Sequence, residues 1–203
     1  MIRTFLAVEL SVEVRAALVS LQQELKRRIE PEMKGGTRIS WVQPASLHLT
    51  IKFLGDMDEQ MIDPLRDALE QALSTHLAVH VPFERLGGFP RPQSPRVLWI
   101  GPSENWEMGA EAKRIVEIHG AIEQTCDGLG FLRETRPFSP HLTLARIRVG
   151  ERLVGIALTK SGVLDRALSL GALAMGSVAL MRSELKPTGS VYTQLWAVRL
   201  TGA

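Results

Sequence analysis

The chain has 203 residues, 45% hydrophobic and 23% charged, which is the balance of an ordinary globular protein able to bury a core. Its formal net charge of +2 and sequence pI of about 8.9 suit a phosphate-bearing ligand, but the dense Lys and Arg runs of proteins that coat long duplexes are lacking. Cys126 is the only cysteine, which excludes an intramolecular disulfide and a thiolate zinc cage and indicates a reducing compartment, so we expect a cytoplasmic location.

No apolar run approaches the roughly 20 residues that a membrane-spanning helix requires. The longest weakly polar run, residues 171–181, is interrupted by Gly176 and Ser177, and the initial MIRTFLAVELSVEV lacks the apolar segment and cleavage site of a signal peptide. We therefore expect neither a membrane span nor a signal peptide, and the sequence indicates no obligate protein partner.

The first strand and helix are marked clearly. Residues 3–10 alternate in polarity and predict a strand, after which Ser11 stands at a helix N-cap position. Pro31, followed by Gly35 and Gly36, predicts the end of the helix. Five apolar residues at helical spacing form its inward face: Val14, Leu18, Leu21, Leu25 and Ile29.

The next segments predict a strand over residues 47–53 and a helix whose N-cap and first residue are Asp63 and Pro64. Residues 79–86 predict another strand, and GGFPRPQSP predicts a loop. The helix would bury three leucines: Leu65, Leu69 and Leu73.

In the second half, residues 96–100 predict a strand, and Ser103 is placed to cap one long helix that stops near Gly128 and Gly130. Residues 141–146 predict a further strand. The apolar positions of the long helix are Trp106, Ile115, Ile118, Ile122 and Leu129.

Residues 151–170 fit either helix or loop, and both interpretations stay open. Residues 177–185 and 192–200 predict two closing strands joined by a turn at Pro187 and Gly189. Because strands often follow one another through short turns, the order favours an α+β fold with antiparallel sheets over a doubly wound fold. No Gly-rich phosphate loop of the nucleotide-binding types is present.

One motif occurs once in each half of the chain. LHLTIKF at 47–53 and PHLTLAR at 140–146 share a His-Leu-Thr-aliphatic core, and His48 and His141 are 141 − 48 = 93 residues apart, close to half the chain. This repetition predicts two similar lobes related by a pseudo-twofold axis, with helices outside and a cleft between them, in one bilobal domain over residues 1–203.

The motif has a strand pattern, in which alternate side chains share a face. His48, Thr50 and Lys52 are therefore expected on one face, with the aliphatic residues between them in a core. His141 and Thr143 are expected to do the same in the second lobe. If the two strands face each other, two imidazoles and two hydroxyls meet in one cleft.

Such a cleft suits phosphodiester chemistry. Opening a cyclic phosphate needs a base to deprotonate water and an acid to protonate the departing ribose oxygen, and imidazole reaches both states near neutral pH. Thr50 and Thr143 can donate hydrogen bonds to the non-bridging phosphate oxygens, whose charge grows in the transition state. This chemistry requires no metal or cofactor.

Simpler interpretations compete with this one. A single His-x-Thr on a strand is usually structural, so the case depends on the second copy at half-chain spacing. His76 and His80 have the spacing of a helical metal pair, but the residues after them are strand-like, and we expect no metal site there. His119 is interpreted as a surface or boundary residue. The packing residues are taken to be Cys126, Trp41, Trp99, Trp106 and Trp196.

The chain resembles the two-histidine (2H) phosphoesterase superfamily, and within it the bacterial and archaeal RNA 2′,3′-cyclic phosphodiesterases, also called 2′-5′ RNA ligases. The resemblance runs nearly end to end. It is carried, in order, by RTFLAVEL, WVQPASLHLTIKFLG, GGFPRPQSPRVLWIG, RPFSPHLTLAR and SVALMRSELKPTGSVYTQL.

The resemblance implies hydrolysis of 2′,3′-cyclic phosphates on RNA ends or nucleotides to 2′-phosphates, with reversible 2′-5′ ligation as a second reaction. It implies that His48 is the proton donor and His141 the proton acceptor, that Arg146 holds the phosphate, and that Phe53 stacks on the terminal base. Both of the latter residues lie five positions after a motif His, so a bulge, strong twist or strand end must turn them toward the cleft.

Three matters stay open at this stage. A non-catalytic nucleotide- or RNA-binding module on the same fold is the alternative function. Hydrolysis and ligation would use the same residues, so the sequence does not separate them. Lys52 lies on the His48 face by alternation, but the resemblance assigns it no role.

Overall fold

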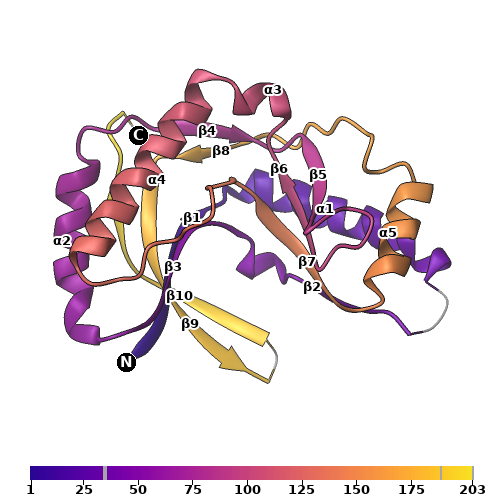
Figure 1. The fold of residues 1–203 in the computed structure, drawn as a ribbon, viewed down its shortest axis with the longest axis horizontal. Helices are drawn as coiled ribbons and strands as arrows, with labels where there is room; N and C mark the ends of the chain where they lie inside the picture. Colours follow the sequence, from indigo (N-terminus) through magenta and orange to yellow (C-terminus); the bar gives the residue numbers. More distant parts are fainter. Residues whose placement is uncertain (34–35, 188, 203) are drawn as a thin grey trace.

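Two four-stranded antiparallel sheets form the framework of the computed structural model, which describes residues 1–33, 36–187 and 189–202 (Figure 1). The first sheet has the strand order β10-β9-β1-β3 and the second β2-β7-β6-β5, while β4 and β8 form a separate pair. The strands are β1 (Ile2–Glu9), β2 (Arg38–Trp41), β3 (His48–Met57), β4 (Val79–Pro82), β5 (Arg85–Phe89), β6 (Val97–Gly101), β7 (Leu142–Val149), β8 (Ala172–Met175), β9 (Ser177–Lys186) and β10 (Gly189–Arg199).

The helices cover the sheets in two groups (Figure 1). Helix α2 (Ile62–Leu73) packs against α4 (Ala110–Gly128) beside the first sheet, and α1 (Val12–Ile29) packs against α5 (Glu151–Lys160) beside the second. Helix α3 (Glu104–Glu107) and three 3-10 turns complete the list: Glu30–Glu32, Pro44–Ser46 and Glu59–Met61. Antiparallel sheets with outer helices confirm the predicted α+β class. No helix in the described part of the chain is long and apolar enough to cross a membrane.

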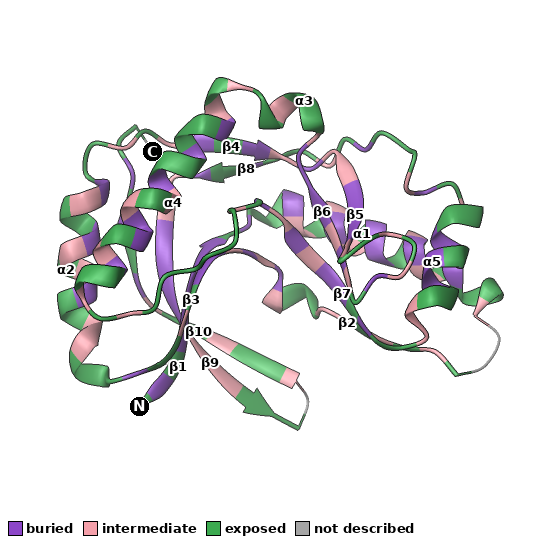
Figure 2. Ribbon diagram, viewed as in Figure 1, coloured by how far each residue is buried: buried purple, intermediate pink, exposed green. Residues whose placement is uncertain are grey.

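The core lies between the sheets and their helices, where the ribbon is coloured as buried in Figure 2. A second, smaller cluster lies on the opposite face of the first sheet, because alternate residues of β1 face opposite ways. It contains Phe5, Ala7, Ala179 and Met181, with Tyr192 packed against it. The face of this sheet that the helices leave uncovered is therefore partly apolar.

Helix α1 confirms its predicted boundaries and face. The Ser11 hydroxyl accepts a hydrogen bond from the Val14 amide at 3.3 Å, and the helix ends at Ile29, before Pro31. Gly36 has a positive φ of 82°, and Gly35 lies outside the described residues. All five apolar residues predicted to face inward are buried.

The predicted cap of α2 is wrong by two residues. The N-cap is Met61, and Asp63 lies in the first turn of the helix. A 3-10 turn precedes α2 and has its own cap, since the Asp58 carboxylate accepts a hydrogen bond from the Gln60 amide at 3.1 Å. The inward face is confirmed, because Leu65, Leu69 and Leu73 are fully buried.

Two predicted elements are divided in the structure. Residues 79–86 form β4 and the start of β5 in different sheets, separated where the Phe83 amide donates to the Gly171 carbonyl. Ser103 caps only the short α3, and Gly109 is the N-cap of the separate α4. Gly87, predicted to lie in a loop, belongs to β5, where a side chain would collide with the Trp99 ring.

The remaining differences concern short or ambiguous segments. Residues 151–170 contain α5 followed by irregular chain, and β2 and β8 are strands that the sequence pattern did not predict. Pro187 and Gly189 lie at the predicted turn between β9 and β10, while Thr188 between them lies outside the described residues.

Candidate active site

A β-bulge in β3 decides where the residues of the first motif point. Thr50 pairs with Ala7 of β1 and Lys52 pairs with Leu6, so Ile51 has no cross-strand partner. The extra residue inverts the alternation beyond it. Phe53 therefore joins the cleft face with His48 and Thr50, as the resemblance requires. The expectation that Lys52 shares this face is wrong, because the bulge turns Lys52 toward α4.

A matching bulge lies at the same place in the second motif. In β7, Thr143 pairs with Trp99 of β6 and Ala145 pairs with Leu98, so Leu144 has no partner on β6. The bulge again follows the motif Thr directly, and it brings Arg146 to the face that carries Thr143. The two lobes thus share a local distortion as well as a sequence motif.

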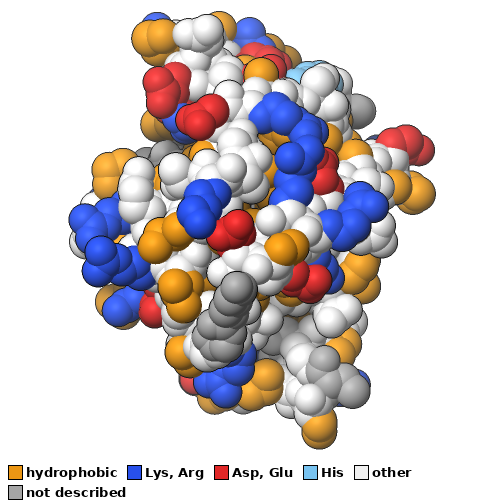
Figure 3. Space-filling model, turned by 90° about the vertical axis from the view of Figure 1, so that its right-hand side faces the viewer, with side chains coloured by type: hydrophobic (Ala, Val, Ile, Leu, Met, Phe, Trp, Pro, Cys, Tyr) orange, Lys and Arg blue, Asp and Glu red, His pale blue; other side chains and the backbone are white. Residues whose placement is uncertain are grey.

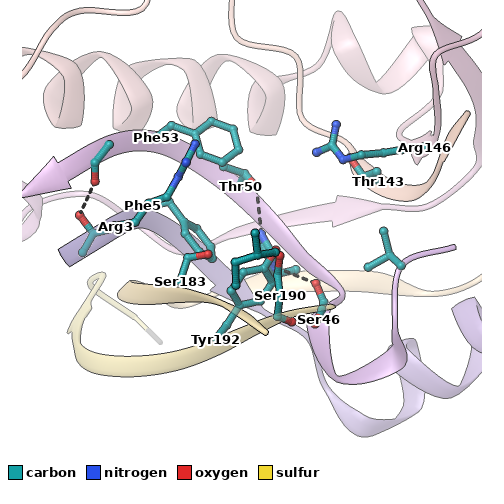
Figure 4. Close-up of a pocket in the computed structure, with 15 residues that line it drawn as sticks. Arg3, Phe5, Ser46, Thr50, Phe53, Thr143, Arg146, Ser183, Ser190 and Tyr192 are labelled. Carbon is teal, nitrogen blue, oxygen red and sulfur yellow. Dashed lines mark hydrogen bonds between the residues drawn. The ribbon is translucent and has the colours of Figure 1, made fainter. Parts of the chain in front are cut away.

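The two motifs line one cavity of about 360 Å³. His48, Thr50 and Phe53 contribute from the first motif, and Thr143 and Arg146 from the second. In Figure 4 the Arg146 guanidinium points into the same space from the side opposite Thr50. Five of the six candidate site residues are therefore brought together around one space.

His48 is held in a fixed orientation by its own backbone and by aromatic rings. Its Nδ1 lies 2.8 Å from the Ser46 carbonyl oxygen, so Nδ1 carries the hydrogen and Nε2 is left for chemistry. Nε2 lies 3.1 Å from the Thr50 hydroxyl. The ring stacks on Phe5 at 4.8 Å between centroids and meets the edge of Tyr192 at 5.2 Å.

His141, the sixth candidate, repeats the same backbone contact in the second lobe. Its Nδ1 lies 2.8 Å from the Ser139 carbonyl oxygen, again two residues earlier. The ring meets the edge of Phe89 at 5.0 Å and lies 6.2 Å from Trp99, but His141 is not among the residues lining the cavity. Trp99, predicted to be a packing residue, thus packs beside a motif histidine.

Burial disfavours the charged form of both imidazoles. It lowers the pKa of His48 to about 4 from 6.5, against the opposing effect of the Ser46 carbonyl, and the charges of Arg15 and Arg146 lower it further. Burial also lowers the pKa of His141, and the charge of Arg146 adds to this effect. One guanidinium therefore acts electrostatically on both motif histidines.

Lys52 lies in a buried ion pair on the far side of β3. Its Nζ lies 2.9 and 2.8 Å from the two carboxylate oxygens of Glu123 on α4 and 2.8 Å from the Leu132 carbonyl oxygen. Glu123 also accepts a hydrogen bond from the Glu134 amide at 3.1 Å. The pair ties the bulged strand to the segment that leads to His141.

His119 is half-buried, as expected of a boundary residue. Its Nε2 lies 3.6 Å from a carboxylate oxygen of Glu123, and its ring stacks on Phe138 at 4.3 Å. Burial lowers its pKa, which Glu123 opposes. Cys126, on the same helix, is fully buried as predicted, and burial raises its pKa to about 12.

Metal ligands do not gather in the structure. Over residues 1–33, 36–187 and 189–202, no group of three or more His, Cys, Asp or Glu side chains could hold a metal ion. His80 lies on β4, where its Nδ1 is 3.5 Å from a carboxylate oxygen of Glu111.

Several cavity residues were not singled out from the sequence. They are Arg3, Phe5, Ser46, Ser183, Ser190 and Tyr192. The alternation of β1 places Arg3 and Phe5 on one face, which could have identified them once Ala7 was known to oppose Thr50. Tyr192 gives no such signal, because its proximity to His48 depends on the pairing of β9 with β1.

The two His-x-Thr motifs lie on different antiparallel sheets, and His48, Thr50, Thr143 and Arg146 line one cavity between them. The family model for LigT-like phosphoesterases matches residues 8–99 and 108–192. The chain therefore belongs to the LigT-like phosphoesterase family.

Individual relatives support this assignment. An RNA 2′,3′-cyclic phosphodiesterase of Methanothermobacter thermautotrophicus is 30% identical over 98% of this chain and 99% of its own length. The protein of the same name from Thermus thermophilus is 35% identical over 98% of this chain and 91% of its own. Among solved structures, TT0787 of Thermus thermophilus matches with a TM-score of 0.70 at 28% identity, covering 98% of both chains. Escherichia coli LigT in complex with 3′-AMP matches in fold, with a TM-score of 0.73 at 22% identity and 98% coverage of both chains.

Proposed function

We propose that the protein hydrolyses 2′,3′-cyclic phosphate termini of RNA to 2′-phosphates by His48/His141 acid–base catalysis. The observation that carries the proposal is the duplicated Nδ1 contact, in which each imidazole is fixed by the carbonyl two residues earlier. Each Nε2 is thereby left to exchange a proton. The names of the relatives support the cyclic phosphate as substrate.

In the proposed reaction, a water oxygen attacks the phosphorus and the P–O3′ bond breaks. His141 Nε2 takes the proton from the water, and protonated His48 donates its Nε2 proton to O3′. The products are a 2′-phosphate and a free 3′-hydroxyl, and each histidine has exchanged its protonation state. In ligation, the 5′-hydroxyl of a second RNA would attack the phosphorus in place of water, so that the same P–O3′ bond breaks and a 2′-5′ phosphodiester and a free 3′-hydroxyl form.

Phosphate binding explains how His48 can carry the proton that the mechanism requires. Burial and Arg146 keep both imidazoles mostly neutral at pH 7 in the free protein, whereas the mechanism needs a proton on His48. A phosphate anion between them compensates the charge of Arg146 and favours the imidazolium, so binding raises the pKa of His48. Protonation would therefore be coupled to substrate binding.

The other site residues bind and stabilise the phosphate and the base. Arg146 holds the phosphate by charge-assisted hydrogen bonds, and the Thr50 and Thr143 hydroxyls donate to the non-bridging oxygens. Phe53, 69% exposed at the cavity edge, offers its ring to the terminal base. Lys and Arg side chains also gather in several groups on one face of the molecule, with Asp and Glu between them (Figure 3). The single buried cysteine agrees with a cytoplasmic enzyme.

The test is hydrolysis of a short RNA ending in a 2′,3′-cyclic phosphate, with the product terminus identified by mass and by sensitivity to phosphatase. His48→Ala and His141→Ala should each lower the rate about 10²- to 10⁴-fold, the range for positioned acid–base groups. His80→Ala, which removes an exposed histidine from β4, is the matched control and should keep the rate. If both motif variants are folded and hydrolyse the RNA at wild-type rates, the binding-module alternative replaces this proposal.

A further inference from the structure

The cavity continues well beyond the residues that the proposed reaction uses. Thr143 and Arg146 lie at one end in Figure 4, whereas Arg3 and Ser183 lie at the other. The aromatic residues occupy the stretch between these ends, and the hairpin of β9 and β10 forms the wall beneath. A second cationic side chain thus lies at the end of the cavity away from the reacting phosphate.

Arg3 is directed to this place by the register of the first sheet. Arg3 and Phe5 share the cleft face of β1, because the side chains of a strand alternate. Phe5 pairs with Met181 of β9, so the continuing antiparallel register brings Arg3 beside Ser183. The position of Arg3 is therefore set by the same sheet that positions His48.

The charge of Arg3 is available to a ligand. Arg3 is exposed, and among the described residues it forms no ion pair within 4 Å, although Asp56 is its cross-strand partner on β3. By contrast, Arg182 of β9 in the same sheet lies 3.3 Å from Glu184. A guanidinium without an anionic partner, at the end of a cavity whose other end suits a phosphate, favours a second phosphate as its ligand.

The covalent structure of RNA supplies that second phosphate. The terminal nucleotide has the cyclic phosphate on its 2′ and 3′ oxygens and a phosphodiester on its 5′ oxygen, with the ribose between them and the base attached to the ribose at C1′. The cavity of about 360 Å³ is at the small end of ligand sites, roughly 300–1,000 Å³, and suits a single nucleotide. The residues along the cavity follow a corresponding order, with Arg146 at the end for the reacting phosphate, then the aromatic rings, then Arg3.

We propose that Arg3, assisted by the Ser183 hydroxyl, binds the 5′-phosphate of the terminal nucleotide and so makes the enzyme prefer RNA ends over nucleoside 2′,3′-cyclic phosphates. This inference rests on the proposed function of the same cavity. It adds a specificity-determining contact at a distance from the reacting atoms. The preference follows because a nucleoside 2′,3′-cyclic phosphate has no group for Arg3 to bind.

The experiment compares two substrates that differ only at the 5′ position: adenosine 2′,3′-cyclic phosphate with a free 5′-hydroxyl and the same compound with a 5′-phosphate. The wild-type protein should show a higher kcat/KM for the 5′-phosphorylated compound. Arg3→Gln should lower this preference by roughly 10- to 100-fold, the effect of losing one hydrogen bond between charged groups. Arg3→Lys should restore part of it, because the charge is kept without the planar fork.

Arg182→Gln is the matched control, since it removes an arginine from the neighbouring strand outside the cavity lining and should leave the preference as in the wild type. Thermal melts check that each variant is folded. An unchanged preference in folded Arg3→Gln, with hydrolysis retained, overturns this inference and leaves the proposed function standing. Absence of hydrolysis of both compounds and of RNA by the wild-type protein overturns both.

Discussion

Removing the Lys52 ammonium should destabilise the protein far more than removing a surface charge. All three ammonium hydrogens have acceptors, two on Glu123 and one on Leu132, and the two charged side chains are 2% and 7% exposed. In Lys52→Met the Glu123 carboxylate stays buried without its counter-charge. Breaking a buried pair in this way costs about 3–5 kcal/mol, a large part of the 5–15 kcal/mol that typically separates folded from unfolded protein.

The double variant Lys52→Met/Glu123→Leu separates the cost of leaving a buried charge without a partner from the cost of lost packing. It removes both charges together, so it should be less destabilised than Lys52→Met alone, because no uncompensated charge remains in the core. Urea unfolding followed by tryptophan fluorescence at pH 7 gives the free energies of unfolding. Arg66→Met removes the partner of Asp63 in an exposed pair on α2 and should cost no more than about 1 kcal/mol.

Two outcomes would refute the reasoning. A loss below about 1 kcal/mol in Lys52→Met would mean that the pair is hydrated rather than buried. A double variant as unstable as the sum of the two single variants would mean that the charges do not interact.

The remaining predictions concern the reaction and its pH range. EDTA should leave turnover intact, since imidazoles and Arg146 supply proton transfer and charge; activity lost in EDTA and restored by a divalent ion would contradict the mechanism. Arg146→Ala should lower kcat/KM at least about 100-fold, whereas Phe53→Ala should mainly raise KM, because stacking on one base is worth only about 1–3 kcal/mol; equal effects would argue against their different roles. The folded pKa of His48 is about 4 against 6.5 for the free side chain, so the folded state binds this proton less tightly than the unfolded state. The neutral His48 therefore contributes to stability above pH 6.5, and this contribution is lost as the pH falls toward 4, by at most about 3 kcal/mol. His48→Gln should flatten this part of the curve of unfolding free energy against pH, measured by urea unfolding.

Elements that depend on local signals were predictable from the sequence. The Ser11 cap and the apolar face of α1 follow from side chains within a few residues of one another, and the structure confirms both. The strands β2 and β8 are four residues long, and each pairs with a strand far away in the sequence. Nothing in their local pattern predicts those partners, so they were missed.

The orientation of Lys52 shows why part of the site could not be predicted from alternation. Ile51 looks like an ordinary inward residue of a strand, and it is buried, yet it is the unpaired residue of the bulge. Counting alternate residues therefore gives the wrong face for Lys52 and Phe53, until a second irregularity at Leu54, which has no partner on β1, restores the count. The correct face of Lys52 is decided by Glu123, which lies 71 residues later in the chain.

The two odd offsets nevertheless contained the information needed to locate the bulges. Phe53 and Arg146 each lie five residues after a motif histidine, and both must face the cleft if the resemblance holds, which no regular strand permits. An extra residue between the motif Thr and that fifth position satisfies both lobes. The unpaired residues Ile51 and Leu144 lie there in the structure, each directly after its threonine. A repeated residue offset that contradicts strand alternation is thus itself a prediction of a bulge, and in this chain it applies at equivalent positions in both lobes.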